Sequence, residues 1–237
     1  MIEAVDLCKH YGSFAAVDHL TFTIRRGEVV AFVGPNGAGK STTMKVLTGY
    51  LAPTSGTARL CGVDVVQDRV RAAEKLGYLP ENGPLYPEMT PRELLAFFAD
   101  ARGLAKARFT ERLEFVTQEC DLHDLLDKPI GTCSKGQKQR VGMAQVLLHD
   151  PEVLIMDEPT TGLDPNQIRH VRGLVKKLGE TRTILLSTHL FQEVEAMADR
   201  VLLVDEGKLA FDGTPAEFKA RGTGNMDQAF HSLTTHR

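Results

Sequence analysis

The sequence predicts an α/β fold with a parallel sheet at its core, a flanking antiparallel β subdomain and an inserted helical subdomain. Three features of the chain lead to this prediction. Four short runs are apolar at almost every position, the first quarter of the chain alternates polar and apolar residues, and residues 85–150 are rich in helical patterns but poor in strand patterns.

The parallel core is predicted from its buried strands. The apolar runs are Val29–Val33 and residues 153–156, 184–186 and 201–204. Strands that are buried on both faces lose the alternation of polar and apolar residues, as happens when helices cover both sides of a parallel sheet. Helical patterns stand between the runs, at residues 39–49, 165–178 and 190–198. This succession of strands and helices indicates a parallel α/β core.

Shorter signals predict the two flanking parts. Residues 2–7, 21–24 and 57–60 have the pattern of strands in an antiparallel sheet beside the core. The helical subdomain begins at a capping box, with an N-cap threonine, a proline at the first helical position and a glutamate at the third, in Thr90-Pro91-Arg92-Glu93. The same device, Thr214-Pro215-Ala216-Glu217, predicts a short helix near the C-terminus.

No internal repeat or low-complexity linker divides the chain, so we expect one domain over residues 1–237. Residues 1–84 and 151–220 should form the catalytic core with its β subdomain. Residues 85–150 should form the helical subdomain, and residues 221–237 a C-terminal tail.

Composition narrows the classes of function. The 28 basic residues against 31 acidic ones give a net charge of −3, whereas proteins that neutralise many polynucleotide phosphates usually carry a basic excess, so no nucleic-acid partner is expected. The cysteines are far apart and lack zinc-site spacing, which is typical of reduced, mostly buried residues in a cytosolic protein. The N-terminus lacks the pattern of a signal peptide, and no apolar stretch approaches the about 20 residues of a membrane-spanning helix. Any role at a membrane therefore requires a partner.

A phosphate-binding loop follows the first buried strand. The motif G-x-x-x-x-G-K-[ST] is matched by Gly34-Pro35-Asn36-Gly37-Ala38-Gly39-Lys40-Ser41, and a helix opens at its end. The glycines let successive N–H groups point inward, and the helix N-terminus adds its own donors. Lys40 then supplies a charge for the β- and γ-phosphates, and Ser41 supplies a hydroxyl for Mg²⁺. Residues 34–42, through Thr42, should bind the phosphates of a nucleoside triphosphate, which makes the core that of a P-loop NTPase.

Two carboxylates, Asp157 and Glu158, end the strand at residues 153–156. Ligands sit beyond the carboxyl ends of strands in parallel α/β sheets. Asp157 should therefore hold Mg²⁺ beside the phosphate loop, and Glu158 should polarise the attacking water. The alternative for such a pair is a solvated turn.

The stretch Cys133-Ser134-Lys135-Gly136-Gln137-Lys138-Gln139-Arg140 resembles the signature of the ATP-binding-cassette (ABC) family, usually written L-S-G-G-Q. Three positions match it, Ser134, Gly136 and Gln137, whereas Cys133 and Lys135 depart from it. Ser134 and Gln137 also fit a capping box for the helix that follows. A capped helix whose first turn carries glycine and lysines is an anion site as well.

This resemblance to ABC ATPases, which covers nearly the whole chain, implies further site residues. It assigns catalysis to Glu158, His189 and Lys40, and stacking on adenine to Tyr11. Residues 134–137 would contact the partner's ATP, and Asp164 would belong to a loop that crosses to the partner subunit. Taken alone, His189 after a strand would be an ordinary surface residue, and Tyr11 before a glycine an ordinary turn residue.

One position departs from the family pattern. Glu81, in Gly77-Tyr78-Leu79-Pro80-Glu81, stands where the family has a glutamine. At an effective dielectric of about 20, a carboxylate about 5 Å from a phosphate oxygen is repelled by roughly 3 kcal/mol per unit charge. We therefore expect Glu81 to face Mg²⁺, the alternative being a side chain directed into the joint with the helical subdomain.

The resemblance implies an ATPase subunit, with ATP and Mg²⁺ as cofactors, in which two identical or different subunits sandwich two ATP molecules. It implies an integral membrane permease as partner and a cytoplasmic location on the inner face of the cell membrane. The residues of the motifs are similar to those of the branch that serves small bipartite exporters of the gliding-motility or multidrug type. The alternatives are a soluble ABC ATPase that acts on nucleic acid or ribosomes, and a small-molecule kinase. The apolar cluster Leu94, Leu95, Phe97 and Phe98 is either core or a docking surface for the permease.

Overall fold

The computed structural model describes residues 1–81 and 83–234 and contains a six-stranded sheet at its centre. Its strand order is β10-β9-β3-β8-β7-β6. These strands are β3 (Val29–Val33), β6 (Leu76–Leu79), β7 (Val153–Asp157), β8 (Thr183–Ser187), β9 (Arg200–Asp205) and β10 (Lys208–Gly213). All neighbours pair in parallel except β10, which is antiparallel to β9. The predicted parallel core is confirmed, with β6 and β10 as strands that the sequence analysis did not identify.

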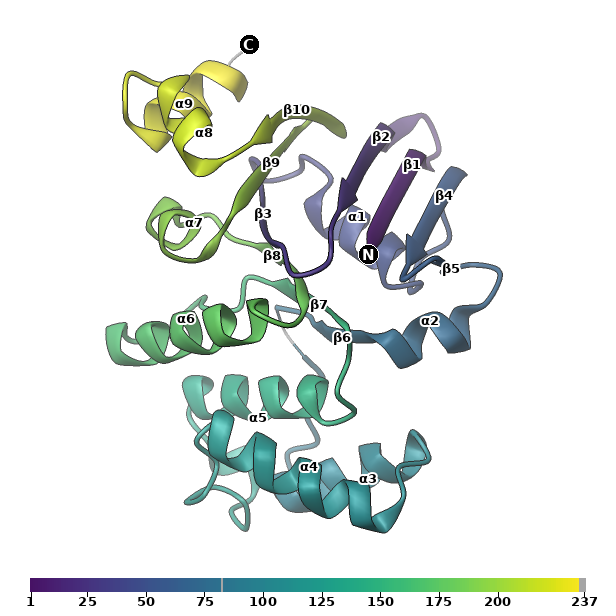
Figure 1. Cartoon of the computed structure of the whole chain (residues 1–237), viewed down its shortest axis with the longest axis vertical. Helices are drawn as coiled ribbons and strands as arrows, with labels where there is room; N and C mark the ends of the chain where they lie inside the picture. The colour runs from purple at the N-terminus through teal and green to yellow at the C-terminus, as the bar shows by residue number, and fades with distance from the viewer. Residues whose placement is uncertain (82, 235–237) are drawn as a thin grey trace.

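A second sheet, of four antiparallel strands, lies beside the first (Figure 1). Its order is β2-β1-β4-β5, with β1 (Ile2–Tyr11), β2 (Phe14–Ile24), β4 (Ser55–Leu60) and β5 (Val63–Asp64). The antiparallel sheet is therefore confirmed, and its first two strands are much longer than predicted.

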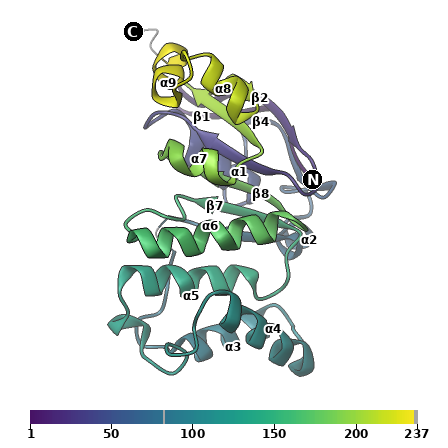
Figure 2. The same ribbon diagram turned by 60° about the vertical axis from the view of Figure 1, so that its left-hand side comes forward.

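Helices cover the central sheet and form a separate layer at one end (Figures 1 and 2). They are α1 (Lys40–Leu47), α2 (Arg69–Lys75), α3 (Pro91–Ala101), α4 (Lys106–Glu119), the 3₁₀ turn η1 (Ile130–Thr132), α5 (Lys135–Leu147), α6 (Pro165–Gly179), α7 (Phe191–Met197), α8 (Pro215–Ala220) and α9 (Met226–Thr234). The predicted capping boxes at Thr90 and Thr214 are both present. In Figure 2, α5 lies between α6 and the pair α3 and α4. The exact division at residues 85 and 150 stays a prediction.

The side chains of β7 explain why this run is apolar throughout. Leu154 and Met156 pack into one hydrophobic cluster with residues of α5 and α6. Val153 and Ile155 pack into the other, with residues of α1 and the antiparallel sheet. Since both faces of the strand are buried, no position along it tolerates a polar residue until the strand ends at Asp157.

The segment predicted as a tail contains a packed helix. In α9, Met226 and Ala229 are buried and join Phe218 of α8 in a third hydrophobic cluster. Residues 235–237 of the predicted tail lie outside the described residues.

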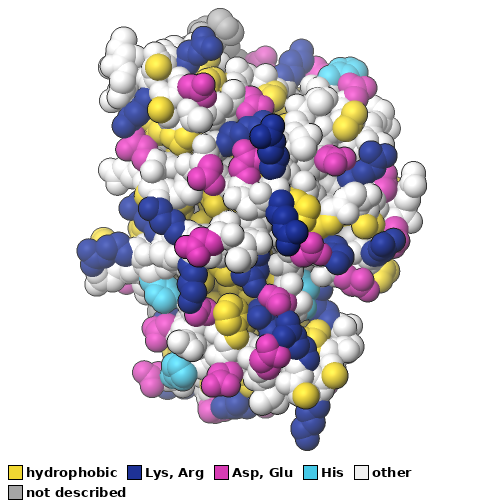
Figure 3. Space-filling view, viewed as in Figure 1, with side chains coloured by type: hydrophobic (Ala, Val, Ile, Leu, Met, Phe, Trp, Pro, Cys, Tyr) yellow, Lys and Arg dark blue, Asp and Glu magenta, His cyan; other side chains and the backbone are white. Residues whose placement is uncertain are grey.

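Among the described residues, no helix is both long and apolar enough to cross a bilayer. On the face shown in Figure 3, basic and acidic side chains are interspersed rather than gathered into a patch of one sign.

Candidate nucleotide-binding site

The phosphate loop joins β3 to α1, and its glycines are required by its shape. Gly37 and Gly39 have φ angles of +83° and +100°, which L side chains rarely adopt. A Cβ atom at Gly39 would also lie 2.2 Å from the carbonyl oxygen of Ala16. Only glycine fits there, because the loop passes against the backbone of β2.

Lys40, the first residue of α1, points back into this loop. Its Nζ donates hydrogen bonds to the carbonyl oxygens of Gly34, at 2.5 Å, and Pro35, at 2.9 Å. Burial lowers the pKa of Lys40, and the nearby carboxylates of Glu158 and Asp157 oppose that shift. The cation is thus partly desolvated and lies near two carboxylates, an arrangement suited to holding a phosphate.

Both predicted carboxylates, Asp157 and Glu158, lie at the carboxyl end of β7, beside the end of the neighbouring parallel strand β8. Asp157 at the end of β7 pairs in register with Ser187 at the end of β8. The hydroxyl of Ser187 donates to Asp157 Oδ1 at 2.6 Å, and the backbone N–H of Glu158 donates to the same hydroxyl at 2.9 Å. Sequence reasoning missed Ser187, although its signal, a small polar residue that ends an apolar strand, is the same as that of Asp157.

Glu158 and His189 are in direct contact. His189 Nδ1 lies 2.8 Å from Glu158 Oε2, and the hydroxyl of Thr161 donates to the same oxygen at 3.0 Å. Glu158 has a φ of +49°, so it stands in the left-handed region that non-glycine residues seldom occupy. Backbone strain of this kind concentrates at functional sites, where the surrounding structure maintains it.

A cleft of about 320 Å³ brings most of the predicted residues together. Its walls are Tyr11, Phe14, Ala16, Asn36, Gly37, Gly39, Lys40, Ser41, Thr42, Glu81, Asp157 and Glu158. Tyr11 and Phe14 are 51% and 61% exposed and stand at the turn of the β1–β2 hairpin. Phe14 and Ala16 were not predicted, because neither belongs to a motif. Glu81 lines this cleft and also the groove beside it, which extends towards α5.

The signature residues are not among the described residues that line this cleft. Ser134 and Gln137 form the capping box that the sequence also predicted for this helix. The backbone N–H of Ser134 donates to Gln137 Oε1 at 2.8 Å, and the N–H of Gln137 donates to the hydroxyl of Ser134 at 3.3 Å. A Cβ on Gly136 would lie 2.2 Å from Gln167 Oε1. The signature helix therefore packs closely against α6 of its own chain.

The loop before α6 is also in contact with the signature. A Cβ on Gly162 would lie 2.4 Å from Nζ of Lys135. Asp164 caps α6 by accepting hydrogen bonds from the backbone N–H groups of Asn166 and Gln167. Within one chain, the side chain of Asp164 is thus used for capping.

A family model described as ABC transporter matches residues 17–161. The chain is 37% identical to an uncharacterized ABC transporter ATP-binding protein, YxlF of Bacillus subtilis, over 95% of this chain and 75% of the relative. It is also 37% identical to the probable multidrug ABC transporter ATP-binding protein YbhF of Escherichia coli, over 98% of this chain but only 41% of that protein. The chain thus spans well under half the length of YbhF.

Solved structures agree with the fold. The ATP-binding subunit of an ABC transporter superposes with a TM-score of 0.90 at 31% identity, over 98% of this chain and 99% of that one. The cassette MJ0796, in a dimeric post-hydrolysis state bound to ADP and phosphate, superposes with a TM-score of 0.81 at 22% identity, over 91% and 99% of the two chains. From its phosphate loop, its strand-end carboxylates, its signature helix and these likenesses, the chain belongs to the ATP-binding subunits of the ABC transporter family.

Proposed function

We propose that this chain drives the movement of a substrate across a membrane by hydrolysing ATP against a separate transmembrane subunit, with two such chains sandwiching two ATP molecules. One observation carries the proposal. The phosphate loop, Asp157, Glu158 and an exposed aromatic residue gather in one cleft, whereas the signature residues of the same chain lie elsewhere. A second copy supplies them.

Within the cleft, each residue has a separate task. Lys40 and the loop N–H groups bind the phosphates, and the exposed face of Tyr11 stacks on adenine. Glu158 polarises the attacking water, while His189, 2.8 Å away, holds that carboxylate and contacts the γ-phosphate. As in other phosphoryl transfers, positioning and electrostatics provide most of the acceleration.

Mg²⁺ fits the donors at this point. Ser41 and Asp157 offer a hydroxyl and a carboxylate, and hard oxygen ligands are the ones that Mg²⁺ prefers. The ion neutralises phosphate charge when it is bound. Ser187 fixes one oxygen of Asp157, which leaves the other for the metal or its waters. Glu81 also lines the cleft and would offer a further carboxylate to the ion or its waters.

The signature acts on the partner's nucleotide. Ser134, Lys135, Gly136 and Gln137 stand at the N-terminus of α5, where backbone donors and the helix dipole favour an anion. Binding there exchanges the hydrogen bonds within the capping box for hydrogen bonds to the partner's phosphates. Asp164 and its loop cross the same interface. The dimeric state of MJ0796 supports this arrangement.

The groove beside the cleft receives a segment of the membrane subunit. It measures about 550 Å³ and includes Leu85 and Phe98. Leu94 and Leu95 are fully buried, so half of the predicted apolar cluster is core. Phe97 is 47% exposed and stacks edge-to-face on Tyr86 and Phe98, so an aromatic surface remains for docking.

The names of two relatives favour export as the direction of transport. One is a probable multidrug protein and another exports Nod factor. We therefore place this chain with the exporters, on the cytoplasmic face of the cell membrane. Its membrane subunit determines the substrate.

A glutamate variant tests this function. Glu158→Gln should keep ATP binding and lose at least 99% of turnover, because the amide keeps the shape of the side chain but not its charge. With ATP and Mg²⁺ it should sediment as a dimer, and without nucleotide as a monomer. Glu180→Gln, at an exposed position after α6, is the matched control and should behave as wild type.

Sedimentation that does not change with ATP, even at high protein concentration, would contradict the sandwich. Hydrolysis by Glu158→Gln at the wild-type rate would remove Glu158 from its role. Purification from detergent extract identifies the partner, since a polytopic membrane protein supports transport and co-purifying nucleic acid contradicts it.

A further inference from the structure

A cluster of metal-ligand side chains lies on the β1–β2 hairpin. Among the described residues, Cys8, Asp18 and His19 offer a thiol, a carboxylate and an imidazole whose ligand atoms all lie within 4.8 Å of one another. None of the three is among the described residues that line the nucleotide cleft. The cluster has no part in the proposed function.

Irregular strand pairing creates the cluster. The register of β1 against β2 shifts twice between residues 4 and 9. Asp6 and His19 have φ angles of 50° and 52°, in the left-handed region. Successive residues of a regular strand point to opposite faces, and a bulge breaks that alternation. Asp18 and His19 are thereby both brought next to Cys8, on the neighbouring strand.

The imidazole is oriented as a metal-binding histidine usually is. His19 Nδ1 lies 2.6 Å from Asp6 Oδ1, and His19 Nε2 lies 3.8 Å from Asp18 Oδ1. In the neutral ring that donates Nδ1–H to Asp6, Nε2 carries the lone pair on the side that faces Asp18. Metal-ligating histidines commonly donate their other ring N–H to such an outer carboxylate, which fixes both the tautomer and the ring.

The thiol is held on the other side of the cluster. Cys8 is 2% exposed, and its Sγ accepts a hydrogen bond from the backbone N–H of His19 at 3.3 Å. Tetrahedral zinc, with bonds of about 2.0–2.3 Å, separates its ligand atoms by roughly 3.3–3.7 Å. The observed separations exceed this by about 1 Å at most, a difference that rotation of the exposed His19 side chain and the partly exposed Asp18 side chain can remove.

Surface ion pairing accounts for only part of the cluster. Lys208 Nζ lies 3.2 Å from Asp18 Oδ2, but the lysine side chain is 67% exposed, and such exposed pairs contribute little to stability. A cation that binds Asp18 displaces it easily. Ion pairing alone does not explain why the buried thiol of Cys8 also lies next to this carboxylate and this imidazole.

We propose that Cys8, Asp18 and His19 bind one divalent transition-metal ion of the zinc class, with Asp6 orienting His19 and solvent completing the coordination. Thiolate, imidazole and carboxylate together suit Zn²⁺ and its neighbours, whereas Mg²⁺ and Ca²⁺ prefer oxygen ligands alone. The spacing of the ligands in the sequence does not reveal the site, because they come from two bulged strands.

Cobalt provides the direct test. Reduced full-length protein without a histidine tag is titrated with Co²⁺, and then with Zn²⁺ against a chromophoric chelator. We expect one equivalent of Co²⁺ with a thiolate charge-transfer band, displaced by Zn²⁺. Cys8→Ser should abolish the band, and His19→Asn, which keeps the left-handed backbone, should weaken Zn²⁺ binding at least tenfold. Asp6→Asn should weaken it by about 10- to 100-fold.

Two controls separate this site from others. Cys61→Ser removes another free cysteine that is not fully buried, and Asp157→Asn removes one carboxylate of the nucleotide cleft. Both should leave the band and the affinity unchanged. A missing band in the wild type, a band lost with Cys61→Ser, or wild-type affinity in His19→Asn would each overturn the proposal. Should Cys8→Ser fail to fold, His19→Asn decides, because the His19 side chain is 69% exposed.

Discussion

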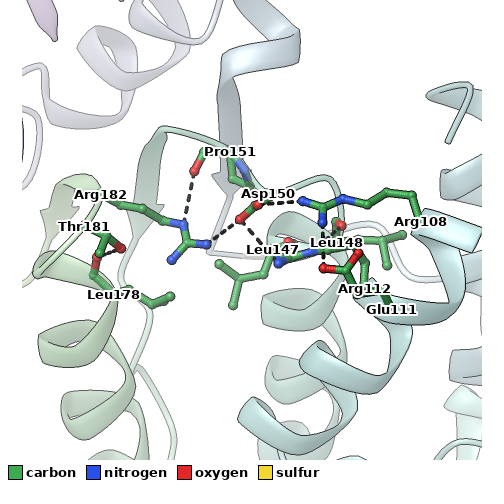
Figure 4. A network of polar contacts seen from close by, with 10 residues as sticks. All are labelled: Arg108, Glu111, Arg112, Leu147, Leu148, Asp150, Pro151, Leu178, Thr181 and Arg182. Carbon is green, nitrogen blue, oxygen red and sulfur yellow. Dashed lines mark hydrogen bonds and ion pairs between the residues drawn. The ribbon is translucent and has the colours of Figure 1, made fainter.

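Replacing Asp150 by asparagine should destabilise the protein more than the loss of an exposed ion pair would. Asp150 precedes β7 and is the centre of a network of three arginines (Figure 4). Arg108 and Arg112 belong to α4, while Arg182 precedes β8. One carboxylate thus joins the helical layer to the starts of the two strands that end at Asp157 and Ser187.

The magnitude follows from burial. The side chains of Arg112 and Arg182 are 6% and 13% exposed, Asp150 is 36% exposed, and Arg108 is 45% exposed. The Arg108 pair is open to solvent and contributes little. The hydrogen bond from Arg182 to the charged carboxylate is worth about 1.5–3 kcal/mol, which the exposure of Asp150 reduces by about half. The ion pair with the buried Arg112, at 3.3 Å, adds up to about 1 kcal/mol, for a total of about 2 kcal/mol.

Two features limit the loss in free energy of unfolding. Arg112 also donates to the carbonyl oxygens of Leu147, at 2.7 Å, and Leu148, at 3.1 Å, so its charge stays partnered in the variant. Asp150 has a φ of 62°, which asparagine also adopts, so the substitution adds no backbone strain. For a chain of this size, about 2 kcal/mol corresponds to a Tm lower by about 4–8 °C.

Urea unfolding at pH 7 measures the change, with Asp127→Asn as the matched control. Asp127 accepts two hydrogen bonds from Arg92, but the two side chains are 73% and 48% exposed. The control should leave the free energy of unfolding nearly unchanged. Equal effects of the two substitutions would refute the argument that burial of the arginines makes the Asp150 network strong.

The pH dependence has a definite sign. Burial raises the pKa of Asp150, but the hydrogen bond from Arg182 and the charges of the three arginines outweigh it, and the net shift is downward. A lowered pKa in the folded state stabilises the protein fully above the unfolded-state pKa, about 3.9. The difference between wild type and Asp150→Asn should therefore be constant from pH 7 to about pH 5 and shrink below about pH 4. A difference that grows on acidification would contradict this assignment.

Three further predictions concern the proposed function. Lys40→Ala should weaken ATP binding by at least tenfold in calorimetry, because it removes charge-assisted hydrogen bonds to phosphate, and unchanged affinity would exclude that contact. Glu81→Gln should raise the Mg²⁺ concentration needed for half-maximal hydrolysis and leave metal-free ATP affinity equal or higher, whereas identical titrations would direct Glu81 to the joint with α5. Phe97→Asp should keep the fold and the ATPase activity but lose the membrane subunit in co-purification. Leu94→Asp, at a fully buried position, should unfold the chain. A Phe97→Asp variant that retains the membrane subunit would contradict docking at Phe97.

The buried strands were predictable because burial on both faces leaves a signal in each residue. The run at residues 153–156 is apolar since its side chains alternate between two hydrophobic clusters. β6 was not predicted because its four residues include Gly77. A Cβ at this position would lie 2.6 Å from the carbonyl oxygen of Val146. A close helix–strand contact requires that glycine, and its presence makes the strand resemble a turn.

The site was predictable where a motif fixes the chemistry, and unpredictable where tertiary contacts bring residues together. The phosphate loop is contiguous, so its residues follow from the sequence. Ser187 and Phe14 are remote from every motif and reach the site through strand pairing and the hairpin turn. α9 was read as a tail because its buried residues, Met226 and Ala229, are few and lie in a short helix.

The signature helix shows why one sequence pattern can serve two purposes without contradiction. Its capping box is complete within the chain, so stability alone accounts for Ser134 and Gln137. Stability does not require Gly136, however, since alanine is a better helix former. The requirement comes from Gln167 of α6, which fills the space of a Cβ. A residue larger than glycine would separate α5 from α6 and move the helix N-terminus that the proposed sandwich presents to the partner's phosphates. Close packing within one chain thus sets the position of the anion site that we propose between two chains.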